Sequence, residues 1–187
     1  MPYANVFAPM GFRLADVNQA YLAVTRPTPA SRTPVGAAAS ADLAIGDAYA
    51  LDANGNAYHA GADATVRGIV TGFELQAIAG VMNAQGPLSI DYASAATAAS
   101  VIGCEDVTTE FECWSDNTIG AVQSNVLGLF NLGDAAPDAN FAQSRQFLNV
   151  NGGAGTQFRI IKLLQSPADN APGPACRVVV KMAQALM

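Results

Sequence analysis

The stretch Asp47-Ala-Tyr-Ala-Leu51, Asp52-Ala-Asn-Gly-Asn56, Ala57-Tyr-His-Ala60 decides the fold class. Two short runs that suit β-strands flank an Asn-Gly pair, and both residues of that pair tolerate a positive φ. This arrangement predicts a β-hairpin. The next run, Val66–Phe73, predicts a third strand, and its two glycines indicate a bulge or the close approach of another backbone.

Short strand-like runs continue on both sides of the hairpin. They recur at intervals of roughly 8–12 residues and are separated by Gly, Pro, Asn and Asp, which is typical of an all-β sandwich or barrel. The clearest lie at residues 158–164 and 177–182, and others are expected at 20–26, 87–92, 100–102, 108–114, 119–122 and 126–130. Residues 141–148 fit a short helix or a strand, and residues 37–43 allow a helical turn.

The chain divides into an N-terminal arm and one domain. Residues 1–18 are apolar but broken by Pro2, Pro9 and Gly11, so they predict no regular element. Such an arm either packs on its own domain or reaches a partner. Residues 19–187 are of a length that suits a single β-sandwich domain.

Composition argues for a covered surface and against polyanionic partners. Charged residues make up 13% of the 187 residues, about half the usual fraction, so much of the surface must be small and neutral. Such a surface suits a subunit that neighbours cover. The net charge is −6 and the nine Lys and Arg are scattered singly. Binding to nucleic acid or to an anionic membrane is therefore not expected.

No arrangement of residues predicts catalysis, a metal or another cofactor. His59 is the only imidazole and no G-x-S-x-G motif accompanies it, so we expect a surface residue of the hairpin. The three cysteines are Cys104, Cys113 and Cys176. Their odd number and spacing predict free, buried thiols in a protein made in a reducing compartment. No signal peptide and no transmembrane run is expected.

Acidic residues gather between residues 105 and 116. They are Glu105, Asp106, Glu110, Glu112 and Asp116. A run of this kind usually forms a solvated face. A cation held together with neighbouring subunits is the alternative.

A series of short motifs, in order along the chain, resembles a known family. The motifs are Ala8-Pro-Met-Gly-Phe12-Arg13, Ile45-Gly46-Asp47-Ala48, Arg67-Gly-Ile-Val-Thr-Gly-Phe-Glu74, the acidic strand 108–116, Ile161-Lys-Leu-Leu-Gln-Ser-Pro-Ala-Asp-Asn170 and the last strand, 176–182. In this order they resemble the capsid decoration, or cement, proteins of tailed bacteriophages. The resemblance spans nearly the whole chain, and residues 75–86 and 131–156 fit it least.

The resemblance implies a jelly-roll-like β-sandwich with an extended N-terminal arm. It implies a non-enzymatic virion protein, made in the host cytoplasm, that binds the outer surface of the major capsid protein lattice as a homo-oligomer, with a dimer favoured over a trimer. On this interpretation Tyr3, Phe7, Phe12 and Arg13 of the arm contact the capsid protein or a neighbouring copy. The alternative is that these aromatic residues pack on the chain's own core.

Two other classes of function are the alternatives. A tail-tube, connector or spike subunit would also be β-rich. A carbohydrate-binding or hydrolytic β-sandwich would need exposed aromatic residues around a carboxylate groove. The chain has a single Trp, Trp114, and we expect this residue and Phe111 to lie in the core of an alternating strand.

Overall fold

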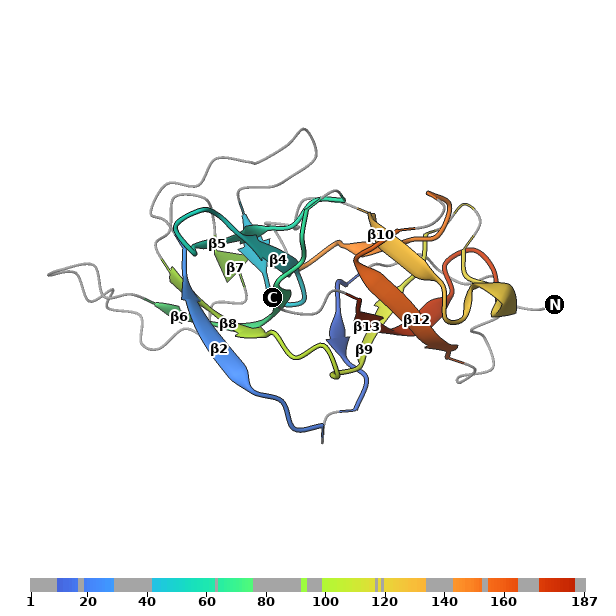
Figure 1. Ribbon diagram of the computed structural model, residues 1–187, viewed down its shortest axis with the longest axis horizontal. Helices are drawn as coiled ribbons and strands as arrows, with labels where there is room; N and C mark the ends of the chain where they lie inside the picture. Colours follow the sequence, from blue (N-terminus) through green and yellow to red (C-terminus); the bar gives the residue numbers. More distant parts are fainter. Residues whose placement is uncertain are drawn as a thin grey trace, which may run out of the picture.

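The protein is all-β. The computed structural model describes residues 10–16, 19–28, 42–62, 64–75, 92–93, 99–116, 118, 120–133, 143–152, 155–164 and 172–183. Within these ranges the strands form antiparallel sheets, and the one helical element is a single 3-10 turn, η1 (Gln123–Asn125). Figure 1 shows a five-stranded sheet in one half of the molecule and a six-stranded sheet in the other.

The five-stranded sheet contains the predicted hairpin. Its strands lie in the order β2 (Ala23–Pro27), β8 (Ala99–Cys104), β6 (Gly68–Leu75), β4 (Ala48–Leu51) and β5 (Ala57–His59), and a separate pair is formed by β3 (Leu43–Ala44) and β7 (Tyr92–Ala93). The turn between β4 and β5 closes because the Asp52 carboxylate accepts the backbone N–H groups of Asn54 and Asn56 at 2.8 and 2.9 Å. Gly55 takes a φ of 81°, as the Asn-Gly signal predicts.

The six-stranded sheet joins both ends of the described chain. Its order is β1 (Arg13–Leu14), β9 (Phe111–Trp114), β13 (Arg177–Met182), β12 (Phe158–Leu163), β10 (Leu129–Gly133) and β11 (Phe147–Asn149). The chain passes from this sheet to the five-stranded one after β1, and returns to it between β8 and β9. Residues 13–14 of the predicted arm are therefore an edge strand of the sheet.

Side chains from both sheets share one apolar core, which makes the fold a sandwich. Ala48, Ile69 and Cys104 of the five-stranded sheet lie in the same buried cluster as Phe111 and Phe158 of the six-stranded sheet. The burial of Phe111 and Cys113, with Glu112 and Trp114 more exposed, confirms the alternation predicted for this strand. A smaller cluster covers the other face of the five-stranded sheet and contains Leu43, Tyr49, Ala57, Val70 and Val101.

Two glycines leave room for the side chain of Tyr49 to lie across the neighbouring strands β6 and β8 of the five-stranded sheet. Tyr49 on β4 is paired with Gly68 on β6, and Gly103 lies one strand further on. A Cβ atom at Gly68 would lie 2.8 Å from the Tyr49 hydroxyl, and one at Gly103 would overlap the Tyr49 ring. The predicted bulge of β6 is present between Val70 and Gly72. The bulge, one of the two alternatives predicted from the glycines, is therefore confirmed, and the atoms nearest a Cβ at Gly68 are the Cys104 carbonyl oxygen and the Tyr49 side chain.

Several strands differ in extent from the prediction, and the one expected at 108–114 begins at Phe111. Residues 119–122 were expected as a strand, but Ala121 forms only an isolated bridge before η1. The strand expected at 126–130 begins later, at Leu129, because Leu127 has a φ of 71° that no strand contains. Within 141–148, only Phe147 and Leu148 are in a strand, and residues 141–142 lie outside the described ranges. Most of 87–92 and of 37–43 also lies outside them.

Candidate functional site

Of the four residues predicted to contact a partner, the structure describes Phe12 and Arg13. Phe12 is 2% exposed, and its ring stacks on Phe158 with centroids 4.6 Å apart. For Phe12 the own-core alternative therefore holds. Arg13 is half exposed and donates to Glu112 at 2.7 Å from the edge strand β1. Tyr3 and Phe7 lie outside the described residues, and their contact role stays a prediction.

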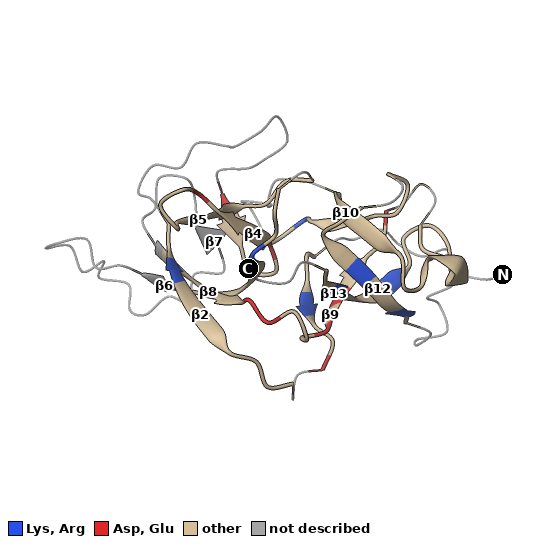
Figure 2. Ribbon diagram, viewed as in Figure 1, with Lys and Arg blue, Asp and Glu red and all other residues tan. Residues whose placement is uncertain are grey.

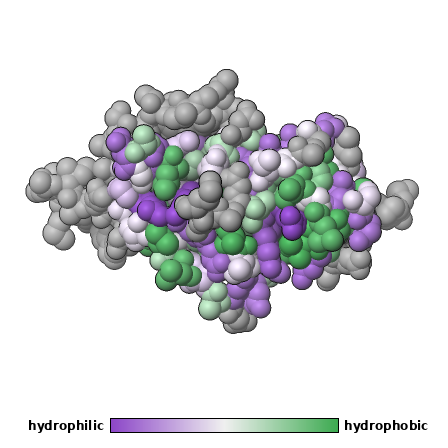
Figure 3. Space-filling view, viewed as in Figure 1, coloured by the Kyte–Doolittle hydropathy of each residue, from purple (hydrophilic) through white to green (hydrophobic). Residues whose placement is uncertain are grey.

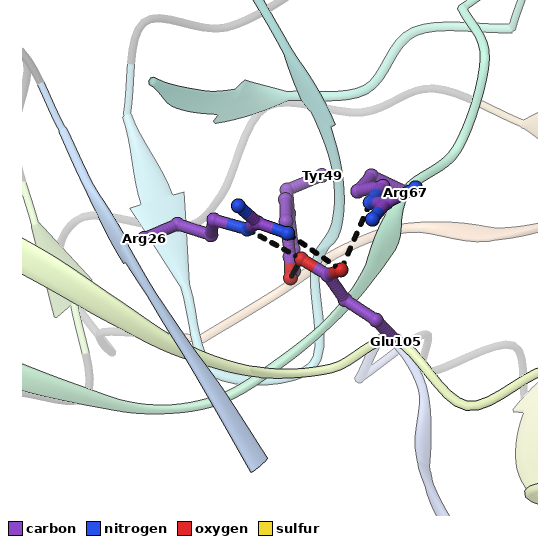
Figure 4. Close-up of polar contacts among 4 residues, drawn as sticks. All are labelled: Arg26, Tyr49, Arg67 and Glu105. Carbon is purple, nitrogen blue, oxygen red and sulfur yellow. Dashed lines mark hydrogen bonds and ion pairs between the residues drawn. The ribbon is translucent and has the colours of Figure 1, made fainter. Parts of the chain in front are cut away.

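Glu105 is the centre of a buried polar network rather than part of a solvated face. Its carboxylate accepts two hydrogen bonds from Arg26 at 2.7 and 2.9 Å, one from Arg67 at 2.9 Å and one from the Tyr49 hydroxyl at 2.8 Å. Figure 4 shows these three side chains converging on Glu105. Burial raises the pKa of Glu105, but the hydrogen bonds from Arg26 and Tyr49 outweigh it and the pKa falls below its usual value. The network ties β2, β4, the start of β6 and the end of β8 together.

The run of acids is divided by the fold: Glu105 and Asp116 are buried, which corrects their predicted place on a solvated face, whereas Asp106, Glu110 and Glu112 stay partly exposed. Asp116 is 5% exposed and accepts the backbone N–H groups of Thr118, Gly120 and Val150. Asp106 accepts from the backbone and hydroxyl of Thr108. The carboxylates of Asp106 and Asp116 are thus satisfied by groups of the chain itself. In the described part of the chain no group of three or more His, Cys, Asp or Glu is placed to hold a metal.

His59 is buried, which corrects its predicted surface position. Its side chain is 0% exposed, and its Nε2 accepts from Gln146 Nε2 at 3.1 Å. The same Gln146 amide donates to the Ala60 carbonyl at 2.8 Å and accepts from the Ala48 N–H at 2.6 Å. Burial lowers the pKa of His59 to about 4, so the ring is neutral at pH 7. This arrangement joins the segment before β11 to the hairpin and serves packing.

The thiols agree with the prediction from sequence. Cys104, Cys113 and Cys176 are buried and form no disulfide. Burial raises the pKa of Cys104 and of Cys113, so both are protonated thiols rather than nucleophiles. No helix among the described residues is long and apolar enough to cross a membrane.

The outer face of the six-stranded sheet is the candidate interaction surface. Val178, Val180 and Met182 of β13 point into the core, so Arg177, Val179 and Lys181 lie on the opposite face. On β12 a bulge between Ile160 and Lys162 breaks the alternation. Because the bulge adds one residue, Arg159 and Lys162 both lie on the outer face and both are exposed.

The sheet thereby gathers basic residues that are far apart in the sequence. Five of the nine Lys and Arg lie on this face, and two glutamates accompany them. The residues are Arg13, Arg159, Lys162, Arg177, Lys181, Glu110 and Glu112. Figure 2 shows Lys and Arg on β12 and acidic residues along β9 and the segment before it. We call this set the charged face.

The central part of the charged face is a set of shared ion pairs. Glu112 accepts from both Arg13 at 2.7 Å and Arg177 at 3.0 Å. The Arg177 guanidinium also lies 5.9 Å from the centre of the Trp114 ring. Trp114 is partly exposed on this face, which corrects its predicted place in the core. No local sequence signal identifies this face, because its members come from strands that pair only in the folded chain.

The comparisons give no relative. No family model, no curated protein and no solved structure matches this chain.

Proposed function

We propose that this chain is a structural virion protein that binds the outer surface of a phage's major capsid protein lattice and stabilises the head. In this role it is not an enzyme, and it acts as a homo-oligomer with a jelly-roll-like sandwich as its body. The fold class is compatible with this role. The observation that supports the proposal best is that Leu127, an apolar residue, is exposed on a strained part of the backbone.

Leu127 combines two unfavourable properties. It is 69% exposed and it adopts a φ of 71°, which costs a residue with a Cβ about 1–2 kcal/mol. The conformation is held by a hydrogen bond from its N–H to the Ile160 carbonyl at 2.8 Å. Apolar surface gathers over this half of the molecule, which holds β10, β12 and η1 (Figure 3). A strained backbone that displays an apolar side chain supports a contact with a neighbouring protein.

A second exposed leucine supports the same interpretation. Leu22 is 77% exposed and lies directly before β2, the edge strand of the five-stranded sheet. Apolar residues beside an open edge invite pairing with another chain unless neighbours cover them. A shell subunit has such neighbours. Anything that binds only the assembled lattice stabilises it by mass action, and many weak contacts add through avidity.

The copy number per particle tests the proposal. Quantitative mass spectrometry of purified virions should find this chain in roughly equimolar amount with the major capsid protein. A handful of copies per particle would instead place it in the tail, connector or spike. Absence from particles would overturn a structural role altogether.

The variant Leu127→Gly separates contact from folding. Glycine accepts the positive φ, so the unfolding free energy should stay the same or rise by about 1 kcal/mol. Binding to particles stripped of this chain should weaken. Ala175→Gly is the matched control, because Ala175 has a φ of 54° but is buried. Unchanged binding of the Leu127 variant would remove Leu127 from the interface.

A further inference from the structure

The strand β2 is the longest edge strand of the two large sheets. It has five residues, against two in β1 and three each in β5 and β11. Ala57 and His59 of β5 are 0% exposed, and an isolated bridge joins Leu148 of β11 to Ser115. Among the described strands β2 pairs with β8 alone, and its alternate residues are exposed (Figure 1). Of these edges, β2 is therefore the one most open to another chain.

The pairing of the inner strands fixes which backbone groups of β2 point outward. Val70 of β6 exchanges its two backbone hydrogen bonds with the residues just before β4, at 2.8 and 2.9 Å. Gly103, its partner on β8, therefore turns its own N–H and C=O toward β2, where it pairs with Val24. Because this direction alternates along a strand, Ala23 and Thr25 present their N–H and C=O groups away from the sheet.

The edge carries no charge that would keep two copies apart. Natural proteins protect edge strands from pairing with unpaired charges, above all lysine. The one charged residue of β2 is Arg26, and Glu105 accepts two hydrogen bonds from its guanidinium at 2.7 and 2.9 Å. Leu22, directly before the strand, is 77% exposed. The edge thus combines outward backbone groups, a neutralised charge and an exposed apolar side chain.

We propose that β2 pairs antiparallel with β2 of a second copy of this chain, so that the two sheets become one across a two-fold axis. The inference rests on the proposed function, in which the chain acts as a homo-oligomer, and it names the strand through which two copies meet. A two-fold axis makes the contact self-complementary, because the donors and acceptors of one edge meet those of the same edge in the other copy.

Pro27 selects the register of this pair. It has no N–H, so at its outward position it can only accept. A pair centred on Thr25 would set Pro27 opposite Ala23 of the other copy and leave the Ala23 carbonyl without a donor. A pair centred on Val24 sets Ala23 opposite Thr25, and every backbone N–H and C=O of these two residues then has a partner. It also places the two Val24 side chains opposite each other with Leu22 beside them, which covers exposed apolar surface.

Cysteine cross-linking tests the contact and its register. The natural thiols are buried, so a cysteine introduced on β2 is the accessible one. In Val24→Cys the two Cα atoms face each other across the axis about 4.5 Å apart, within the range of a disulfide. Treatment of the purified full-length chain with copper phenanthroline should convert most of this variant into a covalent dimer. Thr25→Cys is the matched control, because its two copies lie diagonally, about 7–8 Å apart, beyond that range.

Sedimentation velocity separates pairing from folding. Thr25→Pro removes an outward N–H without removing a hydrogen bond to β8, so the variant should fold. Its dimer dissociation constant should rise about tenfold or more, because the N–H is lost from both copies. Thr25→Ala keeps the N–H, and it should form dimers as the natural chain does. The unfolding midpoint of each variant checks that it is folded, and the cross-linking of Val24→Cys decides if Thr25→Pro is not.

A natural chain that stays monomeric would overturn the inference, as would a folded Thr25→Pro variant that forms dimers as readily as Thr25→Ala. Cross-linking of Thr25→Cys without cross-linking of Val24→Cys would overturn the pairing centred on Val24. The copy number on virions is measured separately from these results. A chain that is abundant on virions but monomeric in solution would refute the pairing alone, and absence from virions with the pairing intact would refute the virion role alone.

Discussion

His59 shows how one buried residue sets a pH range for stability. The ring is neutral in the fold, with its pKa lowered to about 4 from 6.5 by burial. Between these values the unfolded chain binds a proton that the folded chain does not, so stability rises with pH across this window. The contribution is complete above pH 6.5 and is lost as the pH falls toward 4, on the order of 3 kcal/mol.

Denaturant unfolding at a series of pH values measures this prediction. The slope of the unfolding free energy between pH 4 and pH 6.5 should be positive in the natural chain and nearly absent in His59→Gln. The carboxylates supply a separate window at lower pH, since the pKa of Glu105 is depressed below 4.5. An unchanged slope in the variant would show that His59 titrates normally in the fold.

Glu105 concentrates the polar contacts of the five-stranded sheet in one side chain. The variant Glu105→Gln leaves Arg26 and Arg67 without their anion and should lower the unfolding free energy by about 2–4 kcal/mol. The two arginines are 28% and 27% exposed, so water compensates part of the loss. Glu110→Gln is the control, because Glu110 is 32% exposed and makes one ion pair. Its effect should stay within about 0.5 kcal/mol. Equal effects of the two variants would contradict a special role for Glu105.

At the scale of elements, glycines decide how the strands of the five-stranded sheet approach each other. In Gly103→Ala the new methyl group would overlap the Tyr49 ring and displace its hydroxyl from Glu105. We expect a loss of about 2–4 kcal/mol in thermal or denaturant unfolding. At Gly72 a Cβ would meet Ile102 at 3.7 Å, an ordinary contact. Gly72→Ala should therefore be close to neutral, and a large effect there would contradict the packing described.

The sequence predicted those elements whose cause is local. The hairpin follows from Asn54-Gly55, and the last strand, 177–182, has the expected bounds. The bulge of β12 could not be predicted from the sequence, because an extra residue in a strand can be recognised only from its pairing with β13. The ion pairs were missed for a related reason. Arg26 and Arg67 lie 79 and 38 residues from Glu105, so a local run of acids could not indicate their burial.

At the scale of the whole molecule, the crossing between the sheets explains where the polar contacts lie. The chain leaves the five-stranded sheet at Cys104 and enters the six-stranded sheet at Phe111. Glu105 fixes the beginning of this connection, and Glu112 fixes Arg13 and Arg177 just after its end. Glu105 therefore joins segments of the five-stranded sheet, and Glu112 joins β1 to β13 in the six-stranded sheet. Among the described residues, the ion pairs of Glu110 and Glu112 do not include Arg159 or Lys162 of the charged face.

The N-terminal segment is where folding and partner binding can be separated. Phe12 belongs to the core, so Phe12→Ala should lower the unfolding free energy by about 3–5 kcal/mol. A chain lacking residues 2–9 retains Phe12 and Arg13 with their contacts, and its unfolding midpoint should stay unchanged. If Tyr3 and Phe7 contact a neighbour, this truncated chain folds yet fails to bind particles. A loss of stability as large as that of Phe12→Ala would instead show that residues 2–9 pack on the sandwich, and full binding would remove them from the interface.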